Sequence, residues 1–288
     1  MFQTIGIIGK YGDPDIAETL KTFCDYLQQK DFTIMLDESS TELLKNDDTE
    51  TVSRDTLGEH CDLAIVIGGD GTFLSVARSL AAYDIAFLGI NLGRLGFLTD
   101  ISPEDKSTLD AILSGNYQTE ERLLLNAEVV RNGATLHKNL AFNDVVIHKW
   151  EVARMIEFET YVNGIFVNSQ RSDGLIVSTP TGSTAYALSS GGPILHPTLN
   201  AITLVPICPH GMSNRPVVID GNSCIEILIH EEKTANTQVS FDGQYNLGLI
   251  PGDRVVVNKY SRPVRLIHPP EHDHFRLLRA KLHWSQKL

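Results

Sequence analysis

The stretch LAIVIGGDGTFL, residues 63–74, decides the fold of the N-terminal half. Its five consecutive apolar residues, 63–67, are typical of a strand that is buried on both faces of a parallel sheet. A glycine-rich loop follows, and then Leu74, Ala77 and Leu80 recur at helical spacing. The order strand, loop, helix predicts a unit of an α/β fold, with the loop at the carboxyl end of the strand, where ligands bind in such sheets.

The segments around this stretch continue the alternation of strands and helices. We expect strands at residues 4–8, 32–36 and 85–90 and an amphipathic helix over residues 16–27. A further helix is expected to begin with Ser102 as its N-cap and to close at Gly115. The N-terminal half is therefore predicted to be an α/β domain with a mostly parallel sheet.

The pattern changes to a mostly antiparallel β domain near Leu123. Asn132-Gly133 and Asn163-Gly164 each lie between β-prone runs, which is the strongest short-range signal for a hairpin. Further strands are expected at residues 175–178, 201–205, 224–229, 239–241 and 254–257. We predict domains at 1–122 and 123–265. The helix-compatible tail, within 266–288, is expected to pack on the first domain.

Composition disfavours several classes of protein. The 288 residues are 42% hydrophobic and 21% charged, which is ordinary for a soluble globular chain. With 36 acidic and 24 basic residues the formal charge is −12, which disfavours nucleic acid and anionic membranes as partners. We see no secretory signal, no apolar run long enough to span a bilayer and no close cysteine pair. A cytoplasmic location is expected.

The loop Gly68-Gly69-Asp70-Gly71-Thr72 is the first candidate site. Its glycines let the backbone approach a ligand, and the helix that follows offers N–H groups and partial positive charge to a phosphate. The loop matches neither the Walker A nor the Rossmann pattern. The alternative interpretation is a glycine turn with an incidental aspartate.

Two polar stretches in the second half are further candidates. Residues 172–186, SDGLIVSTPTGSTAY, carry a dense array of hydroxyls beside a tyrosine, which suits phosphate, ribose and a ring, but also suits a solvated turn. Asn143-Asp144 places an amide beside a carboxylate, and this pair alone is more often a turn. Asp242-Gly243 falls between β-like runs, and two interpretations stay open: it lines the same site, or, as the better explanation, it is a plain turn.

Taken together, these motifs resemble the NAD kinase family along nearly the whole chain. The resemblance rests on GGDGTFL at 68–74, GRLGFL at 93–98, the Asn-acid pair at 143–144 and SDGLIVSTPTGSTAYALSSGGPILHP at 172–197. The stretches PICPHGMSNRPVVI at 206–219 and LIHP at 266–269 resemble the proteobacterial branch. One departure is Asp144, where relatives often carry Glu.

The resemblance implies that ATP with Mg²⁺ phosphorylates the 2′-hydroxyl of the adenosine ribose of NAD. It implies that Asp70 is the catalytic base, or else the group that holds Mg²⁺ or orients the hydroxyl. Relatives form homodimers or homotetramers. The residues expected to bind the substrates are Gly69, Gly71, Thr72, Arg94, Phe97, Asn143, Asp144, Arg171, Asp173, Thr181, Thr184, Ala185 and Tyr186.

Two other functions remain open at the level of sequence. Lipid kinases share the GGDGT loop, although this chain has neither a basic amphipathic helix nor a polybasic run. A non-catalytic NAD sensor would keep the 178–186 loop but would not need Asp70. Polyphosphate as donor and NADH as acceptor are compatible with the same residues. No metal-ligating residues are predicted, because His272-Asp273-His274 has no third partner nearby in the sequence.

Overall fold

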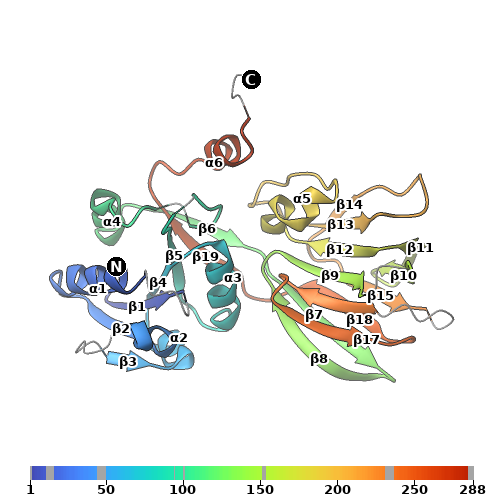
Figure 1. The fold of residues 1–288 in the computed structure, drawn as a ribbon, viewed down its shortest axis with the longest axis horizontal. Helices are drawn as coiled ribbons and strands as arrows, with labels where there is room; N and C mark the ends of the chain where they lie inside the picture. Colours follow the sequence, from blue (N-terminus) through green and yellow to red (C-terminus); the bar gives the residue numbers. More distant parts are fainter. Residues whose placement is uncertain are drawn as a thin grey trace. The chain divides into compact units, whose positions relative to one another are not determined.

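The computed structural model describes residues 2–10, 16–43, 50–93, 95–99, 101–150, 154–230 and 237–284. The chain divides into two compact units (Figure 1). Unit 1 comprises Met1–Glu121 and Val264–Leu288, and unit 2 comprises Arg122–Pro263.

Unit 1 is built on a seven-stranded sheet whose central strands are fully buried. In spatial order its strands are β3 (Glu50–Val52), β2 (Thr33–Asp37), β1 (Thr4–Gly9), β4 (Leu63–Ile67), β5 (Ala86–Ile90), β19 (Val264–His268) and β6 (Gln118–Arg122). The neighbours from β3 to β19 pair in parallel. The predicted α/β architecture with a mostly parallel sheet is confirmed.

Helices pack on both faces of this sheet, and unit 1 also contains the C-terminal helix α6. The helices of unit 1 are α1 (Ile16–Gln28), α2 (Arg54–His60), α3 (Asp70–Ser79), α4 (Lys106–Leu113) and α6 (His274–Lys281), together with the 3₁₀ helix η1 (Glu38–Leu43). The apolar side chains of α1 and α4 share one core with Ile65 and Leu88 of the sheet. On the other face, Phe73 of α3 packs edge-on against Phe87, with ring centroids 6.1 Å apart.

The expected start of the helix near Ser102 is wrong. Helix α4 begins at Lys106, and its N-cap is Asp105, whose Oδ1 accepts the backbone N–H of Thr108 at 3.1 Å. Asp105 is the better N-cap because its carboxylate accepts the hydroxyl of Ser107 in addition to the N–H of Thr108. Ser102 only begins a turn, in which the backbone N–H of Asp105 donates to the carbonyl of Ser102.

Unit 2 consists of two six-stranded antiparallel sheets that share one core (Figure 1). The first sheet is, in spatial order, β11 (Ile165–Ser172), β10 (Ile156–Val162), β15 (Ile225–Ile229), β18 (Arg254–Lys259), β7 (Leu125–Arg131) and β8 (Ala134–Ala141). The second is β14 (Val217–Asp220), β13 (Ala201–Ile207), β12 (Gly174–Ser178), β9 (Asp144–Lys149), β16 (Thr237–Phe241) and β17 (Tyr245–Leu249). The expected antiparallel β architecture is confirmed.

Both predicted hairpins form. Asn132-Gly133 joins β7 to β8 and Asn163-Gly164 joins β10 to β11, and all four residues have positive φ, between 51° and 79°. These values are those of type I′ turns, whose twist matches the twist of the strands that they join.

Six of the described strands were not predicted: β3, β6, β9, β14, β17 and β19. Strand β6 has the sequence QTEER, which lacks an apolar face, so pairing rather than hydrophobicity decides its conformation. Strand β19 pairs in parallel with β5, so the segment after Pro263 supplies part of the sheet of unit 1.

None of the four cysteines, all within the described ranges, is in a disulfide. No helix in the described part of the chain has both the length and the apolarity to cross a membrane.

Candidate active site

Asp70 lies at the carboxyl edge of the sheet of unit 1, as the first residue of α3. Its Oδ2 accepts the backbone N–H of Phe97 at 2.9 Å. Its Oδ1 accepts the backbone N–H of Leu98 at 3.0 Å and the hydroxyl of Thr99 at 3.3 Å. A carboxylate offers about four acceptor positions, so these three bonds fix its orientation and leave about one direction for a substrate.

Gly96 allows this loop to close around Asp70. A Cβ at position 96 would lie 2.2 Å from Asp70 Oδ1 and 2.4 Å from Thr99 Oγ1, closer than any real contact. The close approach of backbone to carboxylate therefore requires glycine here.

We expect Gly96→Ala to lower kcat at least tenfold, because the added methyl group must displace the Asp70 carboxylate from its N–H donors, and a small misplacement of a catalytic group costs up to about 10²-fold. Steady-state kinetics with circular dichroism would measure the effect. Gly248→Ala is the matched control, since its Cβ would meet nothing within 4 Å. Equal kcat in the two variants would contradict the assigned role of the loop.

The other predicted residues of unit 1 surround this loop, with one outside the described part. Gly69 is the N-cap of α3, and Gly71 and Thr72 form the first turn of that helix. The ring of Phe97 is half-buried, and Lys281 Nζ lies 5.6 Å from its centroid. Arg94 lies outside the described residues.

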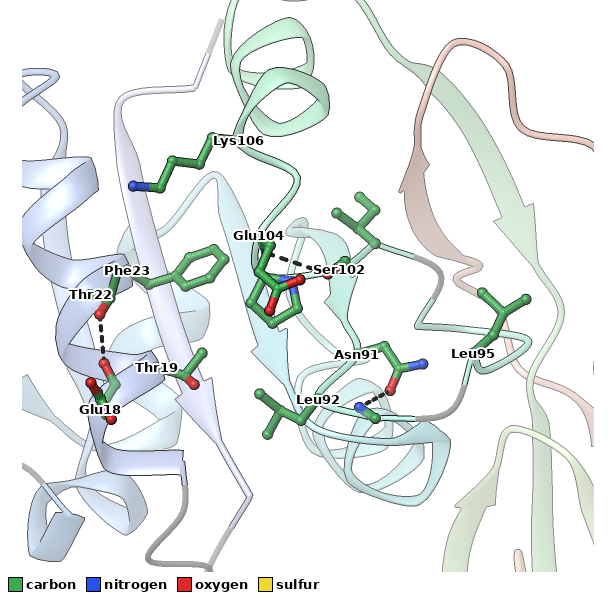
Figure 2. A pocket seen from close by; sticks show the side chains of 13 residues that line it. Glu18, Thr19, Thr22, Phe23, Asn91, Leu92, Leu95, Ser102, Glu104 and Lys106 are labelled. Atoms are coloured by element: carbon green, nitrogen blue, oxygen red, sulfur yellow. Dashed lines mark hydrogen bonds between the residues drawn. The ribbon is translucent and has the colours of Figure 1, made fainter.

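A cavity of about 710 Å³ lies in unit 1 (Figure 2). It is bounded by α1, by the loop that follows β5 and by the segment that leads into α4. Because Ile67 and Ile90 are aligned at the ends of parallel neighbours, the loops that follow β4 and β5 leave the same edge of the sheet. Hydroxyls and an ammonium group line the cavity beside two carboxylates: Thr19, Thr22, Ser102, Lys106, Glu18 and Glu104. The cavity therefore offers both an ammonium group for an anionic ligand and two carboxylates for a cation bound to that ligand.

A second cavity, of about 420 Å³, lies on the outer face of a sheet in unit 2. Alternate residues of β9 and β16 point into it while their neighbours Val145, Ile147 and Phe241 enter the shared core, because successive side chains of a strand face opposite sides. The lining residues are Asn143, Asp144, Val146, His148, Ala185, Tyr186, Gln238, Ser240, Asp242, Gly243 and Asn246.

Asp242 organises the Asn143-Asp144 turn at the floor of this cavity. Its carboxylate accepts the backbone N–H groups of Phe142, Asn143 and Asp144 at 2.9, 2.8 and 3.1 Å. Asp242 and Gly243 have φ values of 51° and 64°, so they also form the turn between β16 and β17. Both interpretations of Asp242-Gly243 therefore hold, since the residues that form the turn also line the cavity.

Asp144 is only 4% exposed, and its environment disfavours the charged form. Burial, and secondly the negative charge of Asp242, raise the pKa of Asp144 to about 7. A carboxyl group with a strongly raised pKa in a cavity is typical of a functional site, because a structural role gains nothing from it. The group is ready to accept hydrogen bonds from ligand hydroxyls.

The 178–186 segment contributes its last two residues, Ala185 and Tyr186, to the lining of the cavity. It contains the 3₁₀ helix η2 (Thr181–Thr184) and the short helix α5 (Tyr186–Ser189). Thr179 Oγ1 donates to the carbonyl of Phe142 at 2.7 Å, and a Cβ at Gly182 would lie 2.1 Å from the carbonyl oxygen of Asn143. This tight packing brings Ala185 and Tyr186 to the cavity. Burial raises the pKa of the Tyr186 hydroxyl, which keeps it protonated at neutral pH.

Four predicted residues do not line the cavity. Asp173 pairs with Lys149 at 2.6 Å, and Arg171 is exposed on β11. Thr181 Oγ1 accepts from Arg122 Nη1 at 3.3 Å, while Thr184 Oγ1 donates to the carbonyl of Thr181 at 3.2 Å.

Sequence reasoning missed several lining residues of the cavity: His148, Gln238, Ser240 and Asn246. The alternation of polar and apolar residues in β16, with Gln238, Ser240 and Asp242 on one face, is the signal that was available. Gln238 Nε2 and His148 Nε2 lie 3.0 Å apart, which joins the two strands across the cavity floor.

Comparison with known protein families assigns both units. Residues 5–117 match the ATP-NAD kinase N-terminal domain, and residues 142–269 match the ATP-NAD kinase C-terminal domain. A NAD kinase of Nitrosococcus oceani is 56% identical over 288 residues, which are 100% of this chain and 98% of the relative. A NAD kinase of Pseudomonas syringae is 48% identical over 288 residues, which are 100% of this chain and 97% of the relative.

Two solved structures share the fold. A yeast NADH kinase complexed with NADH superposes with a TM-score of 0.89 at 25% identity, covering 99% of this chain and 89% of that one. An Archaeoglobus fulgidus NAD kinase in complex with ATP superposes with a TM-score of 0.75 at 26% identity, covering 98% of this chain and 99% of that one. With both family models matched in order and relatives aligned along its whole length, the chain belongs to the NAD kinase family.

Proposed function

We propose that this protein transfers the γ-phosphoryl group of ATP to the 2′-hydroxyl of the adenosine ribose of NAD. The observation that carries the proposal is the cavity of unit 2, in which Asn143, Asp144, Ala185 and Tyr186 converge from separate parts of the sequence. The relatives that are named NAD kinases, and the solved complexes with NADH and ATP, support the same substrates.

We assign the binding of NAD to this cavity by the chemistry of its lining. The amide of Asn143 can both donate to and accept from the edge of a purine. The carboxyl group of Asp144 suits a ribose hydroxyl, because that bond replaces the water that burial has removed. The ring of Tyr186, 47% exposed, offers a face for stacking and a hydroxyl for a polar contact.

We assign the chemistry of the transfer to the loop around Asp70. The 2′-oxygen forms a bond to the γ-phosphorus while the bond from that phosphorus to the β–γ bridging oxygen breaks, and ADP leaves. Asp70 orients the hydroxyl and receives its proton, which is a typical role for a carboxylate in phosphoryl transfer. The N–H groups at the start of α3 face the developing charge on the phosphate. The backbone N–H groups of Phe97 and Leu98, one on each carboxylate oxygen, hold Asp70 in one rotamer.

Magnesium belongs to the donor in this proposal, since Mg²⁺ is usually held by substrate phosphates and one or two carboxylates. The carboxylates of Glu18 and Glu104, which line the larger cavity, fit such an ion. A reaction on dissolved nucleotides also agrees with a cytoplasmic location.

We also propose self-association as a homodimer or homotetramer. Three consecutive side chains on β11, an edge strand, are exposed although they are apolar: Ile165, Phe166 and Val167. An exposed apolar edge is typical of an interface. Phe166→Asp should lower the sedimentation coefficient at micromolar concentration, with Lys138→Asp on the opposite edge strand β8 as control. An unchanged sedimentation coefficient in Phe166→Asp would show that the interface does not include β11.

The acceptor hydroxyl can be tested directly. Purified protein is given ATP, Mg²⁺ and either NAD or its analogue lacking the 2′-hydroxyl on the adenosine ribose, and ADP release is followed. The proposal expects ADP from NAD and at least a hundredfold less from the analogue. Equal ADP release from the two would exclude the 2′-hydroxyl as the acceptor.

A further inference from the structure

Three potential metal ligands come together in unit 1, and none of them is among the residues assigned to catalysis. Glu120 lies on β6, His268 ends β19, and His272 lies in the loop before α6. One ligand atom from each residue lies within 4.8 Å of the others. In the sequence His272 has no evident partners, but β19 and β6 are neighbours in the sheet, which brings Glu120 and His268 to it.

The spacing suits a small divalent ion. Three atoms no more than 4.8 Å apart lie within about 2.8 Å of a common centre, which is 4.8 Å divided by √3. Bonds from zinc to imidazole nitrogen and carboxylate oxygen are ~2.0–2.2 Å long, so each ligand atom must move by less than ~1 Å. His268 Nε2 and a carboxylate oxygen of Glu120 are already 3.4 Å apart.

The surroundings favour a bound cation over a solvent-exposed cluster. The side chain of His268 is 2% exposed and that of Glu120 is 13% exposed. The rings of His268 and His272 stack with centroids 3.8 Å apart at an interplanar angle of 23°, so one ring must rotate for both nitrogens to point at one ion.

The cluster also has a route to solvent. His272 lines a cavity of about 440 Å³ in unit 1, together with three acids and one arginine: Asp105, Glu271, Asp273 and Arg276. The surplus of acids attracts a cation, and the open space leaves room for water as a fourth ligand. Within the loop, His272 N donates to the carbonyl of Pro269 at 3.0 Å, and the Gln118 amide donates to the carbonyl of Pro270.

We propose that Glu120, His268 and His272 bind one divalent transition-metal ion, for which Zn²⁺ is the best match. Two imidazoles and one carboxylate select zinc-like ions over Mg²⁺, which prefers oxygen ligands. The ion would tie β6, β19 and the start of α6 together, a structural role that is independent of the proposed kinase activity. Asp273 takes no part, because it caps α6 through the N–H of Phe275.

The test uses the full chain, stripped with a chelator and then titrated with Co²⁺ or Zn²⁺. We expect one equivalent of metal per chain, visible ligand-field bands with Co²⁺, and displacement of Co²⁺ by Zn²⁺. Zinc at a hundredfold excess over its Kd should raise the Tm by about 5–10 °C. These readouts do not depend on NAD or ATP.

His272→Gln and Glu120→Gln should each weaken metal binding at least a hundredfold and remove the shift in Tm. His60→Gln, which changes an exposed histidine at the end of α2, is the matched control and should behave as wild type. Circular dichroism would verify that the variants fold. Failure of the wild-type chain to bind micromolar Zn²⁺, or unchanged stoichiometry in both ligand variants, would overturn the proposal.

Discussion

Asp70→Asn should reduce turnover at least a hundredfold while the affinity for NAD and the fold stay close to wild type. A carboxamide cannot take the proton of the 2′-hydroxyl, and positioned proton acceptors contribute typically ~10²–10⁴-fold in rate. The side-chain oxygen of Asn can still accept one of the two N–H groups that hold Asp70, so the 96–99 loop keeps part of its anchor. Steady-state kinetics and calorimetric titration with NAD would measure the two effects.

Asp62→Asn is the matched control. The carboxylate of Asp62 also accepts two backbone N–H groups, those of Gln3 at 2.8 Å and Thr4 at 3.0 Å. Asp62 precedes β4, whereas Asp70 follows it, so the two lie at opposite edges of the sheet. A comparable loss of activity in both variants would show that the loss comes from disturbed structure rather than from chemistry at Asp70.

Asp144→Asn should stabilise the protein, and the gain should grow with pH. The pKa of Asp144 is raised to about 7 in the folded protein, from an unfolded value of 3.8. The folded state therefore keeps a proton that the unfolded state releases, and stability falls as the pH rises from about 4 to about 7 and then levels off. The neutral amide removes this penalty. Urea denaturation should show a gain larger at pH 8 than at pH 5 by roughly 3 kcal/mol.

At pH 8, where the Asp144 carboxyl group is mostly ionised, the same substitution should weaken NAD binding at least tenfold, because a hydrogen bond to a charged group contributes about 1.5–3 kcal/mol. Asp253→Asn provides the contrast. Asp253 is fully buried, and its carboxylate oxygens accept from Arg131 at 2.8 Å each, so its removal should destabilise the protein at both pH values. A loss of stability in Asp144→Asn at pH 8 would show that the Asp144 carboxylate is compensated in the folded protein.

The fold class could be predicted because its signals are local. The LAIVI strand and the glycine loop that follows it need only each other to define a βα unit, and the two Asn-Gly turns specify their hairpins through positive φ. Strand β6 could not be predicted, because its sequence QTEER has no apolar face. It is a strand because it pairs with β19, which comes from far along the chain.

The candidate site was predicted in part for the same reason. Asn143, Asp144, Ala185 and Tyr186 belong to continuous motifs, and the structure brings them to one cavity. Gln238 and His148 belong to no motif, and they join the cavity only because β9 and β16 pair in register, Gln238 opposite His148. The role of Asp242 depends on three backbone N–H groups about a hundred residues away, which no local pattern reveals.

Formation of NADP is the measurement that tests the proposed activity most directly. Purified protein is incubated with NAD, ATP and Mg²⁺, and the product is detected with an NADP-specific dehydrogenase, with Asp70→Asn alongside. The account predicts NADP from the wild-type protein and at least a hundredfold less from the variant. Consumption of ATP without NADP, or equal NADP from both proteins, would contradict it.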